Sequence, residues 1–259
     1  MSDLRGENDF EVQLANLELR PHQTFEPAQT PVPRGIVVLA HHWGGNRHSL
    51  LRLRRFYRKL GFDVLSMDFR FHGSNWLTYP YQLRKQWLED FTELAVAARR
   101  IASQRGYSEM GFHARSSFAS VVLSVTAHNV EIRKDFSWGV LECGPFMKGL
   151  GAWYRLAKLY YKIPAPIAAL SAPLMYPLWD LGYDANIRKS LELLHFSPLP
   201  MKYLVLAAAE DPLVPLGDLR TVAERLRAQM EVFDGAGHLE ILKTDFTRFS
   251  GLMKTFIEK

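Results

Sequence analysis

The sequence predicts an α/β fold in which a mostly parallel sheet is flanked by helices. Short apolar runs alternate with segments whose apolar residues recur at helical spacing, a pattern typical of βαβ units with right-handed crossovers. The run at 35–40 is apolar throughout, as expected of a buried parallel strand. With 259 residues, of which 47% are hydrophobic and 23% charged, the chain can bury a sizeable core and is too apolar to be disordered.

The first half of the chain contains most of the predicted elements. Strands are predicted at 10–19, 35–40, 62–67 and 109–113. Helices are predicted at about 50–60, 83–101 and 116–128, where apolar residues lie on one helical face. A Pro-rich turn separates the first two strands, and Gly61 and Gly106 end the first two helices.

The second half adds three strands, at 137–141, 203–207 and 231–233, and a C-terminal helix that should seal one face of the sheet. The interval 146–200 is rich in Tyr, Leu, Ala and Pro and is much longer than a crossover needs. We therefore expect a core domain formed by 1–145 and 201–259, with a helical lid at 146–200 inserted between two late strands. Extra core packing by a few helices is the alternative.

Charge and cysteine content exclude several classes of partner. The 32 Lys and Arg exceed the 27 Asp and Glu by five, without a dense basic run, so no nucleic-acid binding is expected. A single cysteine, Cys143, excludes an internal disulfide and fits a reducing compartment. Residues 1–10 do not form a secretory signal, and prolines interrupt 163–181, so we expect a cytoplasmic protein. The oligomeric state is not predicted.

Ser116 is the candidate nucleophile. Residues 114–118 (Ala-Arg-Ser-Ser-Phe) lie between a predicted strand and a predicted helix, where a nucleophile elbow exposes a serine hydroxyl on a sharp turn. Ala114 and Phe118 replace the usual glycines, so a serine that merely caps the helix is the alternative. A register with His113 as the nucleophile would place the turn inside the apolar run, and we reject it.

A carboxylate and a histidine in later segments complete a candidate triad. The strand at 203–207 leads to Glu210 and Asp211, at the strand end where an open α/β sheet presents catalytic groups. We favour Asp211 because a proline follows it, although Glu210 remains an alternative. His238 follows the last strand on a glycine-rich turn, and the order Ser116, Asp211, His238 is that of the triads on such sheets.

The loop at 41–45 (His-His-Trp-Gly-Gly) is the candidate source of an oxyanion hole. We expect the backbone N–H of Trp43 and that of Ser117, the residue after the nucleophile, to face a developing oxyanion. An ordinary turn before a helix is the alternative for the two glycines.

The histidines near this loop do not predict a metal centre. His41, His42 and His48 match no zinc-binding spacing, and no cysteine or acidic residue accompanies them. We therefore expect neither a metal ion nor a cofactor.

Together these segments resemble the α/β-hydrolase superfamily over nearly the whole chain, from about 10 to 259. The resemblance is carried by the loop at 41–45, Asp-Phe-Arg-Phe-His-Gly-Ser at 68–74, the Ser116 elbow, Glu-Asp-Pro-Leu-Val-Pro at 210–215 and Gly-Ala-Gly-His at 235–238. An elbow without glycines is similar to that of the serine acyl-transferases and thioesterases that include the bacterial luminescence myristoyl thioesterases.

This resemblance implies a mechanism. Ser116 would attack an ester or thioester carbonyl, His238 would act as base and then as acid, and Asp211 would hold His238; water would then hydrolyse the acyl-enzyme. The segment at 68–74 would be structural support, with Arg70 in an ion pair. Departures from the pattern at His42, Phe71 and Phe118 would reshape the pocket or remove the activity.

The aromatic lid predicts a mainly apolar substrate, with a medium or long acyl chain as the first expectation. Candidate substrate-binding residues are His42, Arg115, Phe118, Trp153 and Trp179. The first lid helix also carries a group of cations that would receive an anionic leaving group or make weak contact with an anionic membrane surface: Lys148, Arg155, Lys158 and Lys162. A solvated helical face explains this group equally well.

The leading functional prediction is therefore a serine hydrolase that cleaves small-molecule carboxylic esters or thioesters without a cofactor. The alternative is a non-catalytic module of the same fold that binds an apolar ligand or a protein partner, because fold alone does not determine function. A carbon–carbon bond hydrolase with the same triad is a third possibility that differs in its substrate.

Overall fold

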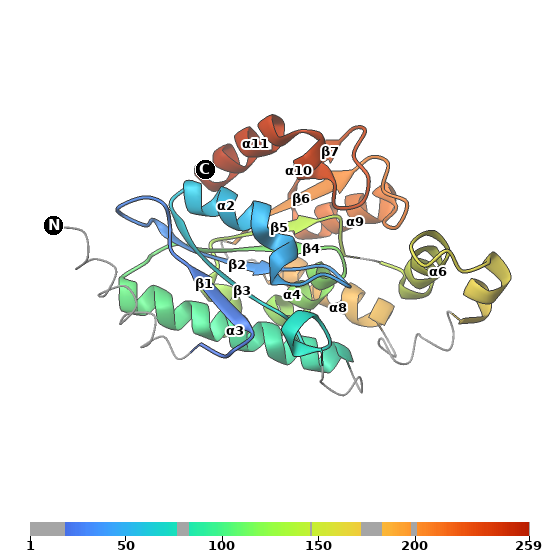
Figure 1. Ribbon diagram of the computed structural model, residues 1–259, viewed down its shortest axis with the longest axis horizontal. Coiled ribbons are helices and arrows are strands. Elements are labelled where there is room, and N and C mark those ends of the chain that lie inside the picture. Colours follow the sequence, from blue (N-terminus) through green and yellow to red (C-terminus); the bar gives the residue numbers. More distant parts are fainter. Residues whose placement is uncertain (1–18, 77–82, 146, 172–182, 198–200, 259) are drawn as a thin grey trace.

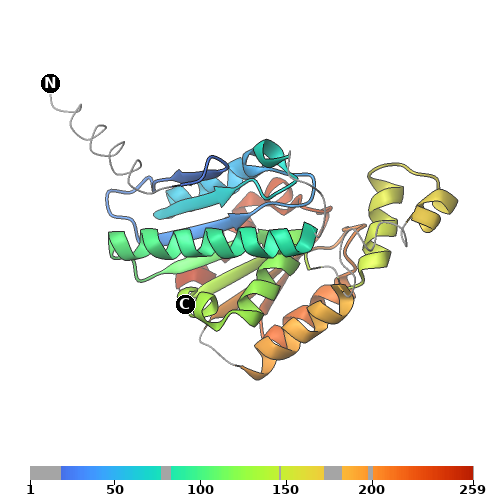
Figure 2. The same ribbon diagram turned by 90° about the horizontal axis from the view of Figure 1, so that it is seen from below.

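The computed structural model describes residues 19–76, 83–145, 147–171, 183–197 and 201–258. At its centre lies a seven-stranded sheet with the order β1-β3-β2-β4-β5-β6-β7. β1 is antiparallel to β3, and the other neighbouring strands are parallel. Helices cover both faces of this sheet (Figure 1; Figure 2). The predicted α/β class, with a mostly parallel sheet between helices, is confirmed.

The strands after β1 agree closely with the predicted ones. They are β2 (Gly35–Ala40), β3 (Phe62–Met67), β4 (Met110–Arg115), β5 (Trp138–Glu142), β6 (Lys202–Ala208) and β7 (Gln229–Phe233). β2 to β5 are buried at every position, which explains why apolar residues predominate in them. The strand predicted at 10–19 falls, except for its last residue, outside the described residues. β1 (Gln23–Glu26) instead lies in the predicted turn. The sequence does not reveal this strand, because only Phe25 among its four residues is buried and no apolar run marks it.

The helices form a layer on each side of the sheet, each with its own apolar cluster. One side carries α2 (Leu51–Lys59), α10 (Ile241–Thr244) and α11 (Phe246–Glu258). The other carries α3 (Leu83–Arg105), α4 (Ser117–His128), α5 (Val130–Asp135), α8 (Tyr183–Phe196) and α9 (Leu216–Leu226). The short helical turns η1 (Arg47–Leu50) and η2 (Gly73–Asn75) follow β2 and β3. None of the described helices is long and apolar enough to cross a membrane.

The segment between β5 and β6 carries the inserted helices. α6 (Gly149–Leu159) and helical residues 165–171 project beyond the sheet (Figure 1; Figure 2). In contrast, α8 packs against α4 and α9. The range predicted for the lid, 146–200, thus includes a helix that packs with the core helices.

Hydrogen bonds between described residues connect the projecting segment, 149–171, to loops at the edge of the sheet. Trp43 Nε1 donates to the hydroxyl of Tyr161 at 3.3 Å. Arg155 Nε, on α6, donates to the carbonyl of Leu213 at 2.8 Å. Arg155, one of the cations expected either to bind an anion or to be solvated, therefore holds α6 against the loop that follows β6.

Candidate active site

The predicted site residues lie on loops that leave one edge of the sheet. The loop at 41–45 follows β2, Ser116 follows β4, Asp211 follows β6 and His238 follows β7. Because these strands are parallel, their carboxyl ends meet at the same edge. Strand pairing therefore brings together groups that are far apart in the sequence.

Ser116, His238 and Asp211 form one hydrogen-bonded relay. Ser116 Oγ lies 2.8 Å from His238 Nε2, and His238 Nδ1 lies 2.7 Å from Asp211 Oδ2. A carboxylate can only accept, so Nδ1 carries the proton and Nε2 accepts from the serine hydroxyl. Asp211 Oδ1 accepts from the amides of Leu213 and Val214 at 2.8 and 3.0 Å, which fixes the carboxylate. Glu210, the alternative acid, is exposed.

The backbone at Ser116 has the sharp turn of a nucleophile elbow. Its φ of 54° and ψ of −127° lie where a side chain is strained, and its amide donates to the carbonyl of Glu142 at 2.8 Å. Ser116 stands at the N-cap position of α4, yet its hydroxyl makes no capping bond. A Cβ on Gly144 would lie 2.1 Å from the Ser116 carbonyl oxygen. Gly144, on the neighbouring loop, thus supplies space that elbow glycines usually supply.

Phe118, predicted to bind substrate, is fully buried in an aromatic cluster beneath the site. Its ring centroid lies 4.3 Å from that of Phe69, 4.9 Å from that of His41 and 5.0 Å from that of Trp87. The large side chain therefore points into the core between α4 and the loops after β2 and β3. In the structure Phe118 supports these loops, and its size does not obstruct the elbow.

The two predicted oxyanion donors lie on segments adjacent to Ser116. Ser117 is the first residue of α4, so its amide belongs to the helix N-terminus, where N–H groups lack intrahelical partners. Trp43 occupies a turn closed by a 2.9 Å hydrogen bond from the amide of Gly45 to the carbonyl of His42. Pairing of Ala40 with Ala114 places this turn next to the elbow.

His41 fixes the loop at 41–45 through two hydrogen bonds of its imidazole. Its Nε2 accepts from the amide of Phe69 at 3.2 Å, so its Nδ1 must carry a proton and donate to the carbonyl of His42 at 2.8 Å. Only a neutral imidazole can make both bonds. Burial, followed by the charge of His72, lowers the pKa of His41 to about 3. The loop therefore depends on an uncharged histidine.

We expect His41 to make the protein less stable in acid. The folded chain keeps His41 neutral, while the unfolded chain protonates it below its ordinary pKa of 6.5. Its stabilising effect is thus complete above pH 6.5 and falls by about 1.4 kcal/mol per pH unit between pH 6.5 and 3. Guanidinium unfolding of the wild type and His41→Gln from pH 7.5 to 5 measures this slope. Below pH 6.5 the free energy of unfolding of the variant should fall less steeply with decreasing pH than that of the wild type, by the equivalent of about one proton. Equal slopes would contradict the assignment.

The other candidate substrate-binding side chains have different surroundings. His42 Nδ1 is buried and has no hydrogen-bond partner among the described residues. Burial, then the charges of Arg115 and His238, lower the pKa of His42 to about 4. Trp153 lies half-buried on α6. Trp179 lies outside the described residues.

Arg115, also predicted to touch substrate, belongs to a buried ionic network. Its Nε and Nη2 donate to the two carboxylate oxygens of Glu142 at 2.8 and 2.9 Å, and Nη2 also donates to the carbonyl of Leu239 at 3.0 Å. His113 Nε2 donates to Glu142 at 3.0 Å, and the Tyr57 hydroxyl donates to His113 Nδ1 at 2.8 Å. Arg115 therefore fixes the main chain of Leu239, the residue that follows His238.

Glu142 was not among the predicted site residues, although it links two of them. Its main-chain carbonyl binds the amide of Ser116, and its carboxylate binds Arg115, which holds the turn of His238. The available signal was a carboxylate at the end of an apolar strand, in register with Arg115 on β4. Recognising it requires the strand pairing, because Arg115 and Glu142 are distant in sequence.

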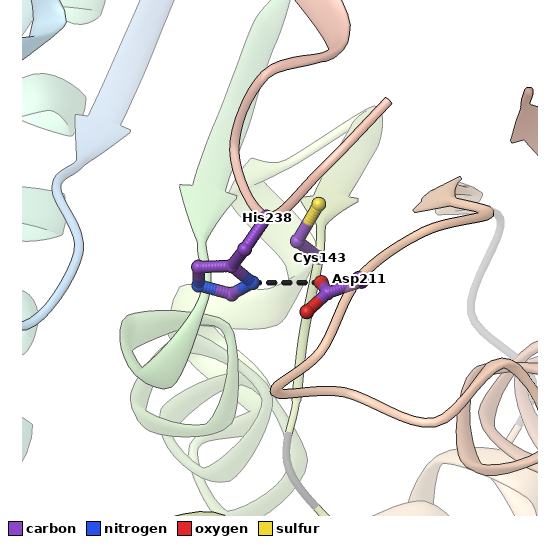
Figure 3. Close-up of side chains that lie close together, drawn as sticks. All are labelled: Cys143, Asp211 and His238. Atoms are coloured by element: carbon purple, nitrogen blue, oxygen red, sulfur yellow. Dashed lines mark hydrogen bonds and ion pairs between the residues drawn. The ribbon is translucent and has the colours of Figure 1, made fainter. Parts of the chain in front are cut away.

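Cys143 lies next to the Asp211–His238 pair, as Figure 3 shows. Burial raises the pKa of its thiol, and the Leu239 amide donates to its Sγ at 3.5 Å. Ligand atoms of Cys143, Asp211 and His238 lie within 4.8 Å of one another. A metal ion there would have to replace the Asp211–His238 hydrogen bond and bind a thiol that resists deprotonation, so these residues fit a metal poorly.

The segment at 68–74 has the predicted supporting role. Asp68 accepts from the amides of Arg47 and Ser74 at 2.7 and 2.9 Å and so joins the loops after β2 and β3. Arg70 forms a 2.7 Å ion pair with Asp90, which confirms its predicted ion pairing.

The chain resembles solved hydrolase structures over most of its length. An esterase of Pyrococcus furiosus has a TM-score of 0.66 and 17% identity, covering 94% of this chain and 92% of its own. A thermostable carboxyl esterase of Bacillus coagulans has a TM-score of 0.64 and 14% identity, with 91% and 94% covered. An α/β serine hydrolase homologue of Coxiella burnetii has a TM-score of 0.57 and 13% identity, with 89% and 88% covered. Neither a protein-family profile nor a curated protein sequence matches the chain. These similarities show that the chain has the α/β-hydrolase fold.

Proposed function

We propose that the protein is a serine hydrolase that cleaves carboxylic esters or thioesters with an apolar acyl portion. The observation that carries this proposal is the relay from Ser116 Oγ to His238 Nε2, at 2.8 Å, and from His238 Nδ1 to Asp211 Oδ2, at 2.7 Å. Nucleophile, base and orienting carboxylate have the connectivity that acyl transfer requires. The similarity to esterase structures supports the proposal.

In the proposed first step, His238 Nε2 accepts the proton of Ser116 as Oγ bonds to the substrate carbonyl carbon. The buried Asp211 carboxylate stabilises the resulting imidazolium through Nδ1. Backbone N–H groups of Ser117 and Trp43 donate to the oxyanion. His238 then returns the proton to the leaving alcohol or thiol as its bond to the acyl carbon breaks.

The second step releases the acyl group. His238 deprotonates a water molecule, whose oxygen attacks the acyl carbon, and the proton then passes to Ser116 as the ester bond to Oγ breaks. A carboxylic acid leaves and the original relay is restored. The hydrogen bond between Trp43 and Tyr161 joins the projecting segment to the loop at 41–45. Their proximity supports an acyl site between them.

A fluorophosphonate probe tests the proposed nucleophile. Mass mapping should find the label on Ser116, and labelling should disappear in Ser116→Ala. Ser117→Ala is the matched control, because it removes a neighbouring hydroxyl and keeps the backbone amide. A folded wild type that remains unlabelled would instead favour the non-catalytic ligand-binding alternative.

A substrate panel tests the acyl preference. Acyl thioesters and p-nitrophenyl esters of graded chain length should give higher kcat/KM for medium or long chains than for acetyl. A preference for acetyl would contradict an apolar acyl site beneath the projecting segment.

A further inference from the structure

A groove between α2 and α11 lies outside the candidate active site. Its volume is about 320 Å³, near the lower end of the range for small-molecule sites. It is lined by two regular helical faces, with Arg52, Arg55, Phe56, Lys59 and Leu60 from α2 and its C-cap, and Phe246, Ser250 and Lys254 from α11. Figure 1 shows these two helices beside each other on one face of the sheet.

The interior of the groove is apolar. Phe56 is buried and packs edge-to-face against Phe246, with ring centroids 6.1 Å apart. Phe246 nevertheless remains 53% exposed, and Leu60 is half-buried. The two helices thus leave unburied apolar surface in the groove between them, and an alkyl chain could cover it.

The charged groups at the groove are all cationic. Arg52, Arg55, Lys59 and Lys254 are exposed, and none of them forms an ion pair with a described residue. The other two cations of α2, Arg54 and Arg58, share one carboxylate, that of Glu26, which compensates part of their charge. The groove therefore concentrates four positive charges without an acidic lining residue, which favours an anion.

We propose that this groove binds a single-chain anionic amphiphile, with the carboxylate of a medium- or long-chain fatty acid as its occupant. The alkyl chain lies along Phe56, Leu60 and Phe246, and the carboxylate meets the surrounding cations. Because the groove is concave and small, it can enclose one alkyl chain, whereas a flat bilayer surface would not fit into it. Binding here does not depend on the proposed hydrolase activity.

Titration calorimetry with monomeric dodecanoate and the full chain tests the proposal. Dodecanoate should bind with an affinity that falls as ionic strength rises. Acetate and dodecyltrimethylammonium should not bind, since each lacks one of the two features that the groove recognises. Equal binding of acetate would reduce the groove to a general anion site and overturn the proposal.

Arg55→Glu should weaken dodecanoate binding at least about tenfold, because it reverses one charge at the groove. Arg220→Glu, which reverses an exposed cation on α9, is the matched control and should leave the affinity unchanged. Equal losses in both variants would indicate a general charge effect and contradict the site. Thermal unfolding of each variant checks that it is folded.

A diazirine-bearing dodecanoate analogue then locates the bound chain. Crosslinks should map to peptides that contain 52–60 and 246–254. Crosslinks confined to 41–45 or 149–171 would place the fatty acid in the candidate active site and overturn the proposal. Vesicles of anionic phosphatidylglycerol provide the last arm, because binding to vesicles without binding of monomeric dodecanoate would assign the groove to a membrane surface instead.

Discussion

Replacing Ser116 by alanine should lower kcat for a medium-chain ester by a factor on the order of 10⁶. The hydroxyl is the only atom group lost, and the proposed covalent step cannot occur without it. The helix N-terminus and the loop at 41–45 remain, so the residual rate should still exceed the rate in water alone. Steady-state assays with p-nitrophenyl octanoate, corrected for spontaneous hydrolysis, measure the loss.

His238→Ala should be about as inactive as Ser116→Ala, and the double variant should be no worse than either. The two groups act as a unit, since the histidine is useful only to the serine at 2.8 Å. Losses that multiply in the double variant would show that Ser116 and His238 act independently, contrary to the relay.

Ser117→Ala is the control for a general effect of altering the elbow. Its buried hydroxyl has no hydrogen-bond partner among the described residues, whereas its proposed role uses only the main chain. We expect this variant to retain activity within about tenfold of the wild type. A loss as large as that of Ser116→Ala would mean that disturbance of the elbow, and not removal of the nucleophile, explains both variants.

The sequence predicted strands and site residues best where a local residue pattern determines the structure. Buried strands such as 35–40 are apolar throughout, and the residues that end them project from one edge of a parallel sheet. This logic predicted the proximity of Ser116, Asp211 and His238, which the relay now displays. The weak elbow motif mattered less than the order in which the three residues follow their strands.

Other features depend on tertiary contacts that leave no local pattern. Gly144 gives the elbow its space, but a glycine after a strand reads as an ordinary turn until the Ser116 carbonyl is seen beside it. Phe118 looks like an obstacle or a pocket residue until its side chain is found among aromatic rings. Likewise, α8 belongs to a tyrosine-rich interval by sequence and to the core helices by packing.

The second large effect is expected from Arg115→Met, which should lower the free energy of unfolding by about 3 to 5 kcal/mol. Glu142 is completely buried, and burial alone would raise its pKa. The Arg115 guanidinium and the His113 N–H reverse this and lower the pKa of Glu142 to about 2. Without Arg115, the buried carboxylate at neutral pH has lost its counter-ion, and the carbonyl of Leu239 has lost a donor.

Activity should fall together with stability, through the position of His238. In the wild type the amide of Leu239 donates to Cys143 and its carbonyl accepts from Arg115, so both main-chain polar groups of this residue are held. Arg115→Met releases the carbonyl, and kcat should fall more than KM rises, because the base is displaced while the substrate contacts remain. A normal kcat in a folded Arg115→Met protein would remove Arg115 from the positioning of His238.

The pH dependence separates an unpaired charge from a mere loss of packing. In the wild type the pKa of Glu142 lies below its ordinary 4.5, so its stabilising effect is complete above pH 4.5 and is lost as the pH falls toward 2. In Arg115→Met that pKa should rise, and the stability deficit should shrink as the pH is lowered toward 5, because the carboxyl can then be protonated. Adding Glu142→Gln should recover part of the deficit at pH 7, since the amide oxygen can still accept from His113 without a charge. If the double variant is instead the less stable one and the deficit does not vary with pH, the contribution of Arg115 is packing and not charge.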